Sequence, residues 1–227
     1  MSLPVLVIGR SGSGKTFSLK EFKKGEVSII SVEKGRLPFK SDVQVARIPN
    51  NFENGEKTSA GAVNAAKYAW ICNAIKTAPT KAVVIDDSQY LLVNELFDRA
   101  YEKGYDKFTE MAAKFRNLIH FVNDLDDDSK IVYFLHHSET DTDGREKVKT
   151  IGKMLDEKLT VEGCFDIVLY CKDQKFYTQG DSISVAKSPE GMFQSVEIPN
   201  DLKAVNDTIR EYYGITVDKK PKNKEEK

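Results

Sequence analysis

The sequence predicts an α/β fold: a mostly parallel central sheet with helices on both faces. Short apolar runs alternate with longer amphipathic stretches, which is the pattern of strands alternating with helices. Several of these runs are apolar throughout, as in parallel strands buried on both faces. The runs also end in polar residues, and ligands of such sheets bind at the carboxyl ends of the strands. Together these observations predict three layers: helices, sheet and helices.

The strands follow from runs such as Val83-Val84-Ile85, in which every residue is apolar. A hairpin is expected around residues 175–178, and a polar segment at 138–153 breaks the pattern. The buried strands are expected at residues 4–8, 27–32, 81–87, 131–135 and 166–171, with a further short strand within 41–48.

The helices follow from apolar residues at helical spacing and from residues that favour helix ends. Ser59 and Asp201 are expected to cap two helices at their starts, and Gly214 is expected to end the last one. In the helix that begins at Ser59, Trp70 is expected to be a core or partner-facing anchor. An apolar stripe in that helix is expected at Ala62, Ala65, Ala66, Ala69, Cys72 and Ile75. The helices are expected at residues 17–22, 59–77, 88–103, 106–126, 153–161 and 201–213.

Length and composition describe an ordinary globular protein. A chain of 227 residues suits one sizeable α/β domain, which we expect at residues 1–214. Residues 215–227, rich in lysine and glutamate, are expected to form a disordered tail. The net charge of −1 gives no overall attraction to nucleic acid, so such binding would need a local basic patch.

The three cysteines, Cys72, Cys164 and Cys171, form an odd set without C-x-x-C spacing. They indicate buried thiols in a reducing compartment rather than disulfides or a zinc site. No apolar run approaches the roughly 20 residues that a bilayer crossing needs, and no signal peptide is visible. We therefore expect a cytoplasmic protein that does not bind membranes.

Residues 9–16, GRSGSGKT, match the phosphate-binding motif G-x-x-x-x-G-K-[ST], and the strand–loop–helix context fits this motif. The glycines allow positive φ and let backbone N–H groups surround the β-phosphate. Lys15 can bridge the β- and γ-phosphates, and the Thr16 hydroxyl can bind Mg²⁺. We therefore predict ATP and Mg²⁺ as cofactors, with the preference for ATP over GTP left open. The predicted nucleotide-binding residues are Gly9, Arg10, Ser11, Gly12, Ser13, Gly14, Lys15, Thr16 and Phe17.

Carboxylates follow two of the predicted strands. Asp86 comes directly after an apolar strand, as does the acidic residue that supports Mg²⁺ beside such a loop, so Thr16 and Asp86 are the predicted metal residues. The alternative role for Asp86 is a helix N-cap, which Asp87 or Ser88 could supply instead. Two carboxylates compete to activate the attacking water: Glu33, at the end of the second strand, which we favour, and Asp87.

The strand at residues 131–135 ends in His136-His137, where a polar side chain could sense the γ-phosphate. We predict His137 as this sensor, alongside Lys15 in catalysis, and a purely structural histidine is the equal alternative. A metal role is not expected, because the remaining histidine, His120, lies inside a helix.

The segment 145–153 carries four positive charges and one negative charge. A basic loop beyond the γ-phosphate sensor could contact single-stranded DNA. A solvated charge run and a finger that reaches a neighbouring subunit's nucleotide are the alternatives. The predicted nucleic-acid-binding residues are Arg145, Lys147, Lys149 and Lys153.

The order of the motifs resembles a minimal RecA-like ATPase core, and most closely the short RecA-like ATPases of bacteriophages, some of which are single-strand annealing recombinases. The resemblance covers residues 3–213 and rests on GRSGSGKT, IISVEKG, VVIDDS, YFLHHSE and KTIGKMLDEKLTVEGCFDIVLY. It implies a P-loop ATPase acting on single-stranded DNA in phage recombination or replication, in the host cytoplasm and with homo-oligomers as a possible state.

The resemblance also implies roles for single residues. Glu33 matches the catalytic glutamate of RecA-type proteins. The strand at 131–135 would lie between the P-loop strand and the Asp86 strand, with His137 where the family commonly has glutamine. The segment 138–153 matches the second DNA-binding loop in position only, and an obvious oligomerisation arm is missing.

Two other functions remain open from the sequence. A nucleotide or small-molecule kinase would use the same P-loop, although the arginines are scattered and do not form a lid. An ATP-dependent switch that controls a protein partner, such as a helicase, would bind nucleotide with little turnover.

Overall fold

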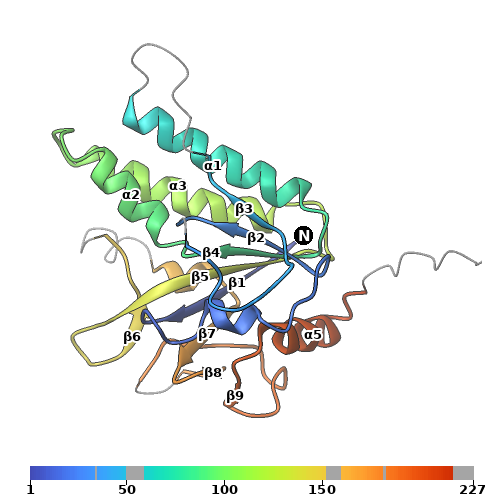
Figure 1. The fold of residues 1–227 in the computed structure, drawn as a ribbon. Coiled ribbons are helices and arrows are strands. Elements are labelled where there is room, and N and C mark those ends of the chain that lie inside the picture. The colour runs from blue at the N-terminus through green and yellow to red at the C-terminus, as the bar shows by residue number, and fades with distance from the viewer. Residues whose placement is uncertain (34, 50–58, 152–159, 181–182, 217–227) are drawn as a thin grey trace, which may run out of the picture.

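The computed structural model describes residues 1–33, 35–49, 59–151, 160–180 and 183–216. They form the predicted three-layer α/β fold, in which a nine-stranded sheet has helices on both faces. In Figure 1, helices α1, α2 and α3 cover one face, while α5 and the short helix η1 lie on the other. This is the three-layer fold of P-loop NTPases. Among these residues, no helix is both long enough and apolar enough to cross a membrane.

The sheet has the order β3-β2-β4-β5-β1-β7-β8-β9, with β6 paired to the end of β5. From β3 to β7 neighbouring strands are parallel, whereas β6, β8 and β9 pair antiparallel. As the resemblance implied, β5 lies between β1 and β4. The strands are β1 (Leu3–Gly9), β2 (Val27–Ser31), β3 (Val45–Arg47), β4 (Ala82–Asp86), β5 (Ile131–Thr140), β6 (Glu146–Val148), β7 (Ile167–Lys172), β8 (Lys175–Tyr177) and β9 (Glu197–Pro199).

The helices begin and end largely where their capping residues predict. The Ser59 side chain accepts a hydrogen bond from the N–H of Ala62, and Asp201 caps the last helix in the same way. Gly214 ends that helix with φ of 64°. The helices are α1 (Ala60–Thr77), α2 (Tyr90–Asp98), α3 (Asp106–Asn123) and α5 (Leu202–Tyr213), with 3-10 turns η1 (Thr16–Leu19) and η2 (Val161–Cys164).

The core forms on both faces of the sheet. Side chains of the central strands alternate between a cluster under α1–α3 and a cluster under α5, because successive residues of a strand point to opposite faces. In β1, Leu6 and Ile8 join the first cluster, and Val5 and Val7 join the second. Trp70 is half-buried and packs against the first cluster, as expected of an anchor.

Several predicted elements differ from the structure. The expected helix at 17–22 is only the four-residue turn η1, and Gly25, with φ of 84°, lies in a later turn that leads into β2. The second helix is shorter than predicted, and β5 runs past residue 135 to Thr140. The predicted helix at 153–161 and the predicted tail lie mostly outside the described residues.

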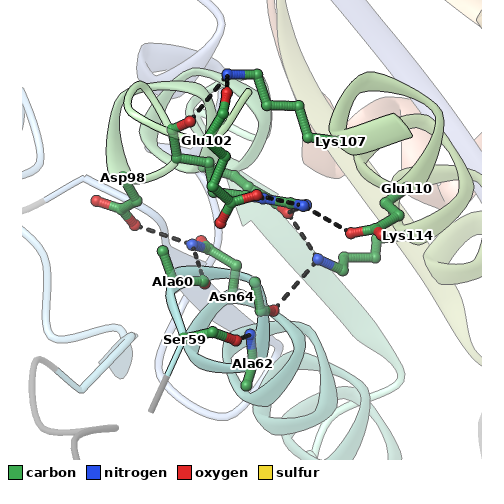
Figure 2. A network of polar contacts seen from close by, with 12 residues as sticks. Ser59, Ala60, Ala62, Asn64, Asp98, Glu102, Lys107, Glu110 and Lys114 are labelled. Carbon is green, nitrogen blue, oxygen red and sulfur yellow. Dashed lines mark hydrogen bonds and ion pairs between the residues drawn. The ribbon is translucent and has the colours of Figure 1, made fainter. Parts of the chain in front are cut away.

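A buried ionic cluster joins the three helices of one face (Figure 2). Arg99, whose side chain is 5% exposed, lies 3.0 Å from Glu95 and 2.8 Å from each of Glu102 and Glu110. Lys114 of α3 contacts the same Glu95 oxygen at 2.6 Å, and it also reaches the carbonyl oxygen of Gly61 in α1. The cluster therefore connects α1, α2 and α3 around the buried charges of Glu95 and Arg99.

Candidate functional site

The motif at residues 9–16 forms a loop between β1 and η1, at the carboxyl edge of the sheet. Gly12 and Gly14 adopt φ of 78° and 108°, which is the left-handed region that favours glycine. At Gly9 a Cβ atom would come within 2.4 Å of the Cys171 carbonyl oxygen. The loop can therefore pack against β7 only because Gly9 carries no side chain.

The loop borders a cavity of about 670 Å³. The cavity has polar walls on the loop side and an apolar wall from Phe17 and Pro38. Its volume suits a nucleotide-sized ligand. The lining residues are Ser11, Gly12, Gly14, Lys15, Thr16, Phe17, Pro38, Asp87, Tyr90, His137 and Gln174.

Lys15 is buried, and its ammonium is held by the loop itself. Its Nζ donates hydrogen bonds to the carbonyl oxygens of Gly9 at 2.7 Å and Arg10 at 3.0 Å. Burial lowers the pKa of Lys15 from its ordinary value. A phosphate would supply the full counter-charge that carbonyl dipoles do not, so the ammonium is available to an anionic ligand.

Thr16 and Asp86 meet at the end of β4. The Thr16 hydroxyl donates to Oδ1 of Asp86 over 2.9 Å, and Asp86 is 7% exposed. Burial, together with the neighbouring charge of Asp87, raises the pKa of Asp86 to about 6. A hydroxyl and a carboxylate are oxygen ligands of the kind that Mg²⁺ prefers, so these residues fit the ion.

In the described parts of the chain, the Thr16–Asp86 site included, no three His, Cys, Asp or Glu side chains form a group suited to a metal ion. An ion held by Thr16 and Asp86 would therefore need phosphate oxygens and water as its other ligands. Such a site is typical of Mg²⁺ in phosphoryl transfer.

Asp87 and His137 form a pair inside the cavity. Nε2 of His137 lies 3.2 Å from Oδ1 of Asp87, and the His137 ring packs edge-on against Tyr90 at 5.7 Å between centroids. Asp87 has φ of 59°, a left-handed conformation that is uncommon outside glycine and often found at functional sites. The turn directs its carboxylate toward the phosphate-binding loop rather than along α2.

Glu33, the predicted water-activating residue, does not line this cavity. It lines an adjacent cavity of about 410 Å³, where it accepts a hydrogen bond of 2.8 Å from Nδ2 of Asn94. Tyr90 lines both cavities and stands between them. The structure thus brings Lys15, Thr16, Asp86, Asp87 and His137 together and leaves Glu33 apart.

His136 is fully buried and neutral, and it links two elements. Burial lowers its pKa to about 4. Since a carbonyl oxygen can only accept, Nε2–H donates to the Lys149 oxygen at 2.9 Å, and Nδ1 then accepts from the Ser88 hydroxyl at 2.9 Å. The imidazole therefore connects the turn after β4 to the segment that follows β6.

The predicted basic loop is partly an ordered hairpin, which corrects the expectation of a polar break at 138–153. Its fourth predicted cation, Lys153, lies outside the described residues. Arg145 and Lys149 are exposed, while Lys147 lies 3.7 Å from Glu139. The hairpin forms because Ser138, Glu139 and Thr140 pair with β6.

The hairpin is also connected to the phosphate-binding loop. Glu146 is 5% exposed and accepts a hydrogen bond of 2.8 Å from Nε of Arg10. Thr140 and Ser138 donate to the same carboxylate, and these partners lower the pKa of Glu146 against the effect of its burial. A displacement of the phosphate-binding loop would therefore be transmitted to the hairpin.

Four residues near the cavity were not predicted from the sequence. Pro38 and Tyr90 line it, Gln174 reaches it from the turn between β7 and β8, and Asn200 braces the loop. Pro38 and Tyr90 each follow a strand that ends at the site, and this position could have marked them as candidate site residues. Gln174 and Asn200 come from the antiparallel edge, whose pairing the sequence does not specify.

Comparison with protein families identifies the chain's family. A family model described as an AAA domain matches residues 1–193, which includes the loop, β4, β5 and the turn after β7. Among curated proteins, none matches the chain.

Proposed function

The chain belongs to the AAA-domain family, a family of P-loop ATPases, and from this premise we propose that it hydrolyses ATP in the cavity beside residues 9–16. The proposal rests on the hydrogen bond of 2.9 Å from the Thr16 hydroxyl to Asp86. Thr16 directly follows Lys15, whose ammonium the loop holds. Phe17 and Pro38 form an apolar wall of the same cavity.

In this proposal each residue has one task. The backbone N–H groups of the loop surround the β-phosphate, and Lys15 leaves its carbonyl partners for the β- and γ-phosphates. Thr16 and Asp86 would hold Mg²⁺, which when bound neutralises charge on the phosphates. Asp87 accepts a proton from the attacking water, and His137 orients the Asp87 carboxylate.

The assignment of the site is tested by replacing Lys15 with alanine and measuring ATP binding and turnover. Removing the buried ammonium should abolish one or both, because no other cation lines the described cavity. Lys24→Ala is the matched control, since Lys24 is exposed and does not line the cavity. Turnover by Lys15→Ala equal to that of the unaltered chain would refute the site.

We further propose that the ATPase acts on single-stranded DNA, in phage recombination or replication. Support comes from the exposed Arg145 and Lys149. The phosphate-binding loop contacts their segment through the Arg10–Glu146 hydrogen bond, and His136 contacts it at the Lys149 carbonyl. Binding of nucleotide at the phosphate-binding loop and binding of DNA at the hairpin would then influence each other. ATP turnover measured with and without single-stranded DNA tests this, and indifference to DNA would contradict it.

A second candidate function, a P-loop kinase, is favoured by one observation. The cavity that holds Glu33 adjoins the nucleotide cavity across Tyr90 and has polar walls that include Asn64, Lys67 and Asn94. Such a cavity could hold a phosphate acceptor. Screening nucleosides, nucleotides and small alcohols for ATP-dependent phosphorylation separates the two functions, and a phosphorylated product would favour the kinase.

A further inference from the structure

The turn between β7 and β8 has an unusual residue at its second position. Asp173 and Gln174 both have positive φ, 49° and 59°. Two-residue hairpin turns of this kind favour asparagine, aspartate or glycine first and glycine second. Aspartate fits its position, whereas the Cβ of a glutamine makes the left-handed conformation less favourable than it is for glycine. Because Gln174 is exposed, core packing does not account for its side chain.

This turn is fastened to the phosphate-binding loop. The backbone N–H of Gln174 donates to the Ser13 oxygen at 3.3 Å. Nδ2 of Asn200 donates to the Gly14 oxygen at 3.0 Å and to Oε1 of Gln174 at 3.2 Å. At Gly14 an added Cβ would come within 2.6 Å of Asn200 and 2.8 Å of Gln174, so the contact requires glycine.

The hydrogen bonds fix which way the Gln174 amide faces. The Gly14 carbonyl can only accept, so the group of Asn200 that faces it is the NH₂. That same NH₂ faces Gln174, whose oxygen therefore lies toward Asn200. The NH₂ of Gln174 is left without a hydrogen-bond partner among the residues that the structure describes, and Gln174 lines the nucleotide cavity.

The sheet order says which end of the nucleotide Gln174 would meet. Strand β1, which carries the loop, lies between β5 and β7. Asp86 and Asp87 lie at the end of β4 and His137 lies within β5 on one side, and Gln174 follows β7 on the other. If the γ-phosphate lies beside the carboxylates, the nucleoside end lies toward β7.

We propose that Gln174 is a nucleotide-positioning residue, whose NH₂ donates a hydrogen bond to a ribose oxygen of the bound nucleotide. This inference rests on the proposed ATP binding. It explains why an exposed position in a left-handed turn has a glutamine that the turn itself disfavours.

The test compares Gln174→Gly with the matched variant Asp173→Gly, which relaxes the neighbouring left-handed residue and does not line the cavity. Calorimetry in the presence of Mg²⁺ gives affinities for ATP, ADP and inorganic tripolyphosphate, and thermal unfolding of the ligand-free proteins gives their stability. For Gln174→Gly we expect ATP and ADP to bind about tenfold more weakly, as for a lost hydrogen bond. Tripolyphosphate should bind unchanged, because it has no nucleoside end.

Stability separates positioning from a structural role. Glycine suits both turn positions, so the melting temperature of each ligand-free variant should stay level or rise. Asp173→Gly should keep all three affinities. Unchanged ATP affinity in Gln174→Gly overturns the inference, and so does an equal loss for ATP and tripolyphosphate, which would mean that the turn only shapes the loop. If the unaltered chain binds no ATP, the proposed function itself fails, and that result is distinguishable from both.

Discussion

At the scale of single residues, the largest difference between the prediction and the structure concerns Asp87. The sequence favoured Glu33 as the water-activating group because it ends a strand beside the loop. Glu33 instead contacts Asn94 in the neighbouring cavity, while Asp87 lines the nucleotide cavity with His137. Their positions at strand ends predicted that both carboxylates would lie near the site. The direction of the Asp87 side chain, however, depends on the left-handed turn at Asp87, which no residue pattern marked.

The two carboxylates are separated by neutral replacements. Asp87→Asn keeps a residue type that tolerates positive φ, so the fold should persist. Turnover should fall about 100-fold or more, as for the loss of a general base, while Glu33→Gln should retain most of it. Steady-state ATP hydrolysis measures both variants. Loss of turnover in Glu33→Gln with retention in Asp87→Asn would restore the assignment made from the sequence.

His136 gives a prediction about pH. Its folded-state pKa is about 4 against an ordinary 6.5, so the unfolded chain binds a proton between these values and the folded chain does not. Stability from the neutral imidazole is therefore complete above pH 6.5 and is lost as the pH falls toward 4. The loss between about pH 7.5 and pH 5 should be about 2 kcal/mol.

Urea unfolding of the unaltered chain and of His136→Gln at both pH values measures this effect. Glutamine cannot titrate, so the variant should lose about 2 kcal/mol less on acidification. Its lower stability at neutral pH is expected and does not bear on the comparison. Equal pH dependence in the two proteins would show that His136 is not the group responsible.

At the scale of elements, the ionic cluster of Figure 2 sets the packing of α1, α2 and α3. Glu95 is fully buried, and Arg99 and Lys114 balance its charge. Arg99→Met should cost about 3 kcal/mol of unfolding free energy, because it leaves a buried carboxylate with a single partner. Glu110→Gln, whose side chain is 55% exposed, should cost less than about 1 kcal/mol.

The same measurement has an informative double variant. Combining Arg99→Met with Glu95→Leu removes both buried charges, and stability should return toward that of the unaltered chain. If the double variant is as unstable as the sum of its parts, packing volume rather than the unpaired charge determines the loss.

Helix α1 shows why sequence patterns locate elements better than faces. Its start at Ser59 was predicted correctly, and of the expected stripe Ile75 is buried and Cys72 packs against the core, but Ala62, Ala65 and Ala69 are exposed. The buried residues are Asn64, Tyr68, Ile71 and Ile75. Alanine is weakly hydrophobic, so the larger side chains determine which face packs, and buried Asn64 is satisfied by the Ala60 carbonyl and Asp98.

For the whole molecule, the proposed response to DNA depends on charge at one edge of the sheet. Reversing Arg145 and Lys149 to glutamate should weaken binding of single-stranded DNA. It should also flatten the dependence of log K on log salt concentration by about 1.4, or 0.7 for each lost phosphate contact. Lys23→Glu with Lys24→Glu makes the same charge change just before β2, at the opposite edge. Equal effects of the two pairs would indicate a general charge effect and no site on the hairpin.

The overall architecture was predictable because most of its parallel strands are marked by local apolar runs, and the resemblance implied that β5 lies between β1 and β4. The part of the site that the sequence missed comes from the antiparallel edge. Gln174 and Asn200 reach the loop only because β7, β8 and β9 pair in a particular register. Such long-range pairing leaves little trace in short windows of sequence.

The position of β1 has a consequence for synthesis on the ribosome. Its hydrogen-bonding neighbours are β5, from Ile131, and β7, from Ile167, so the strand that bears the nucleotide loop emerges long before either partner. A nascent chain that ends before Ile131 would carry the loop on an unpaired strand whose apolar side chains are open to chaperones. Ribosome-stalled chains should therefore begin to retain ATP only after the codons for β7 have been translated and that strand has left the exit tunnel.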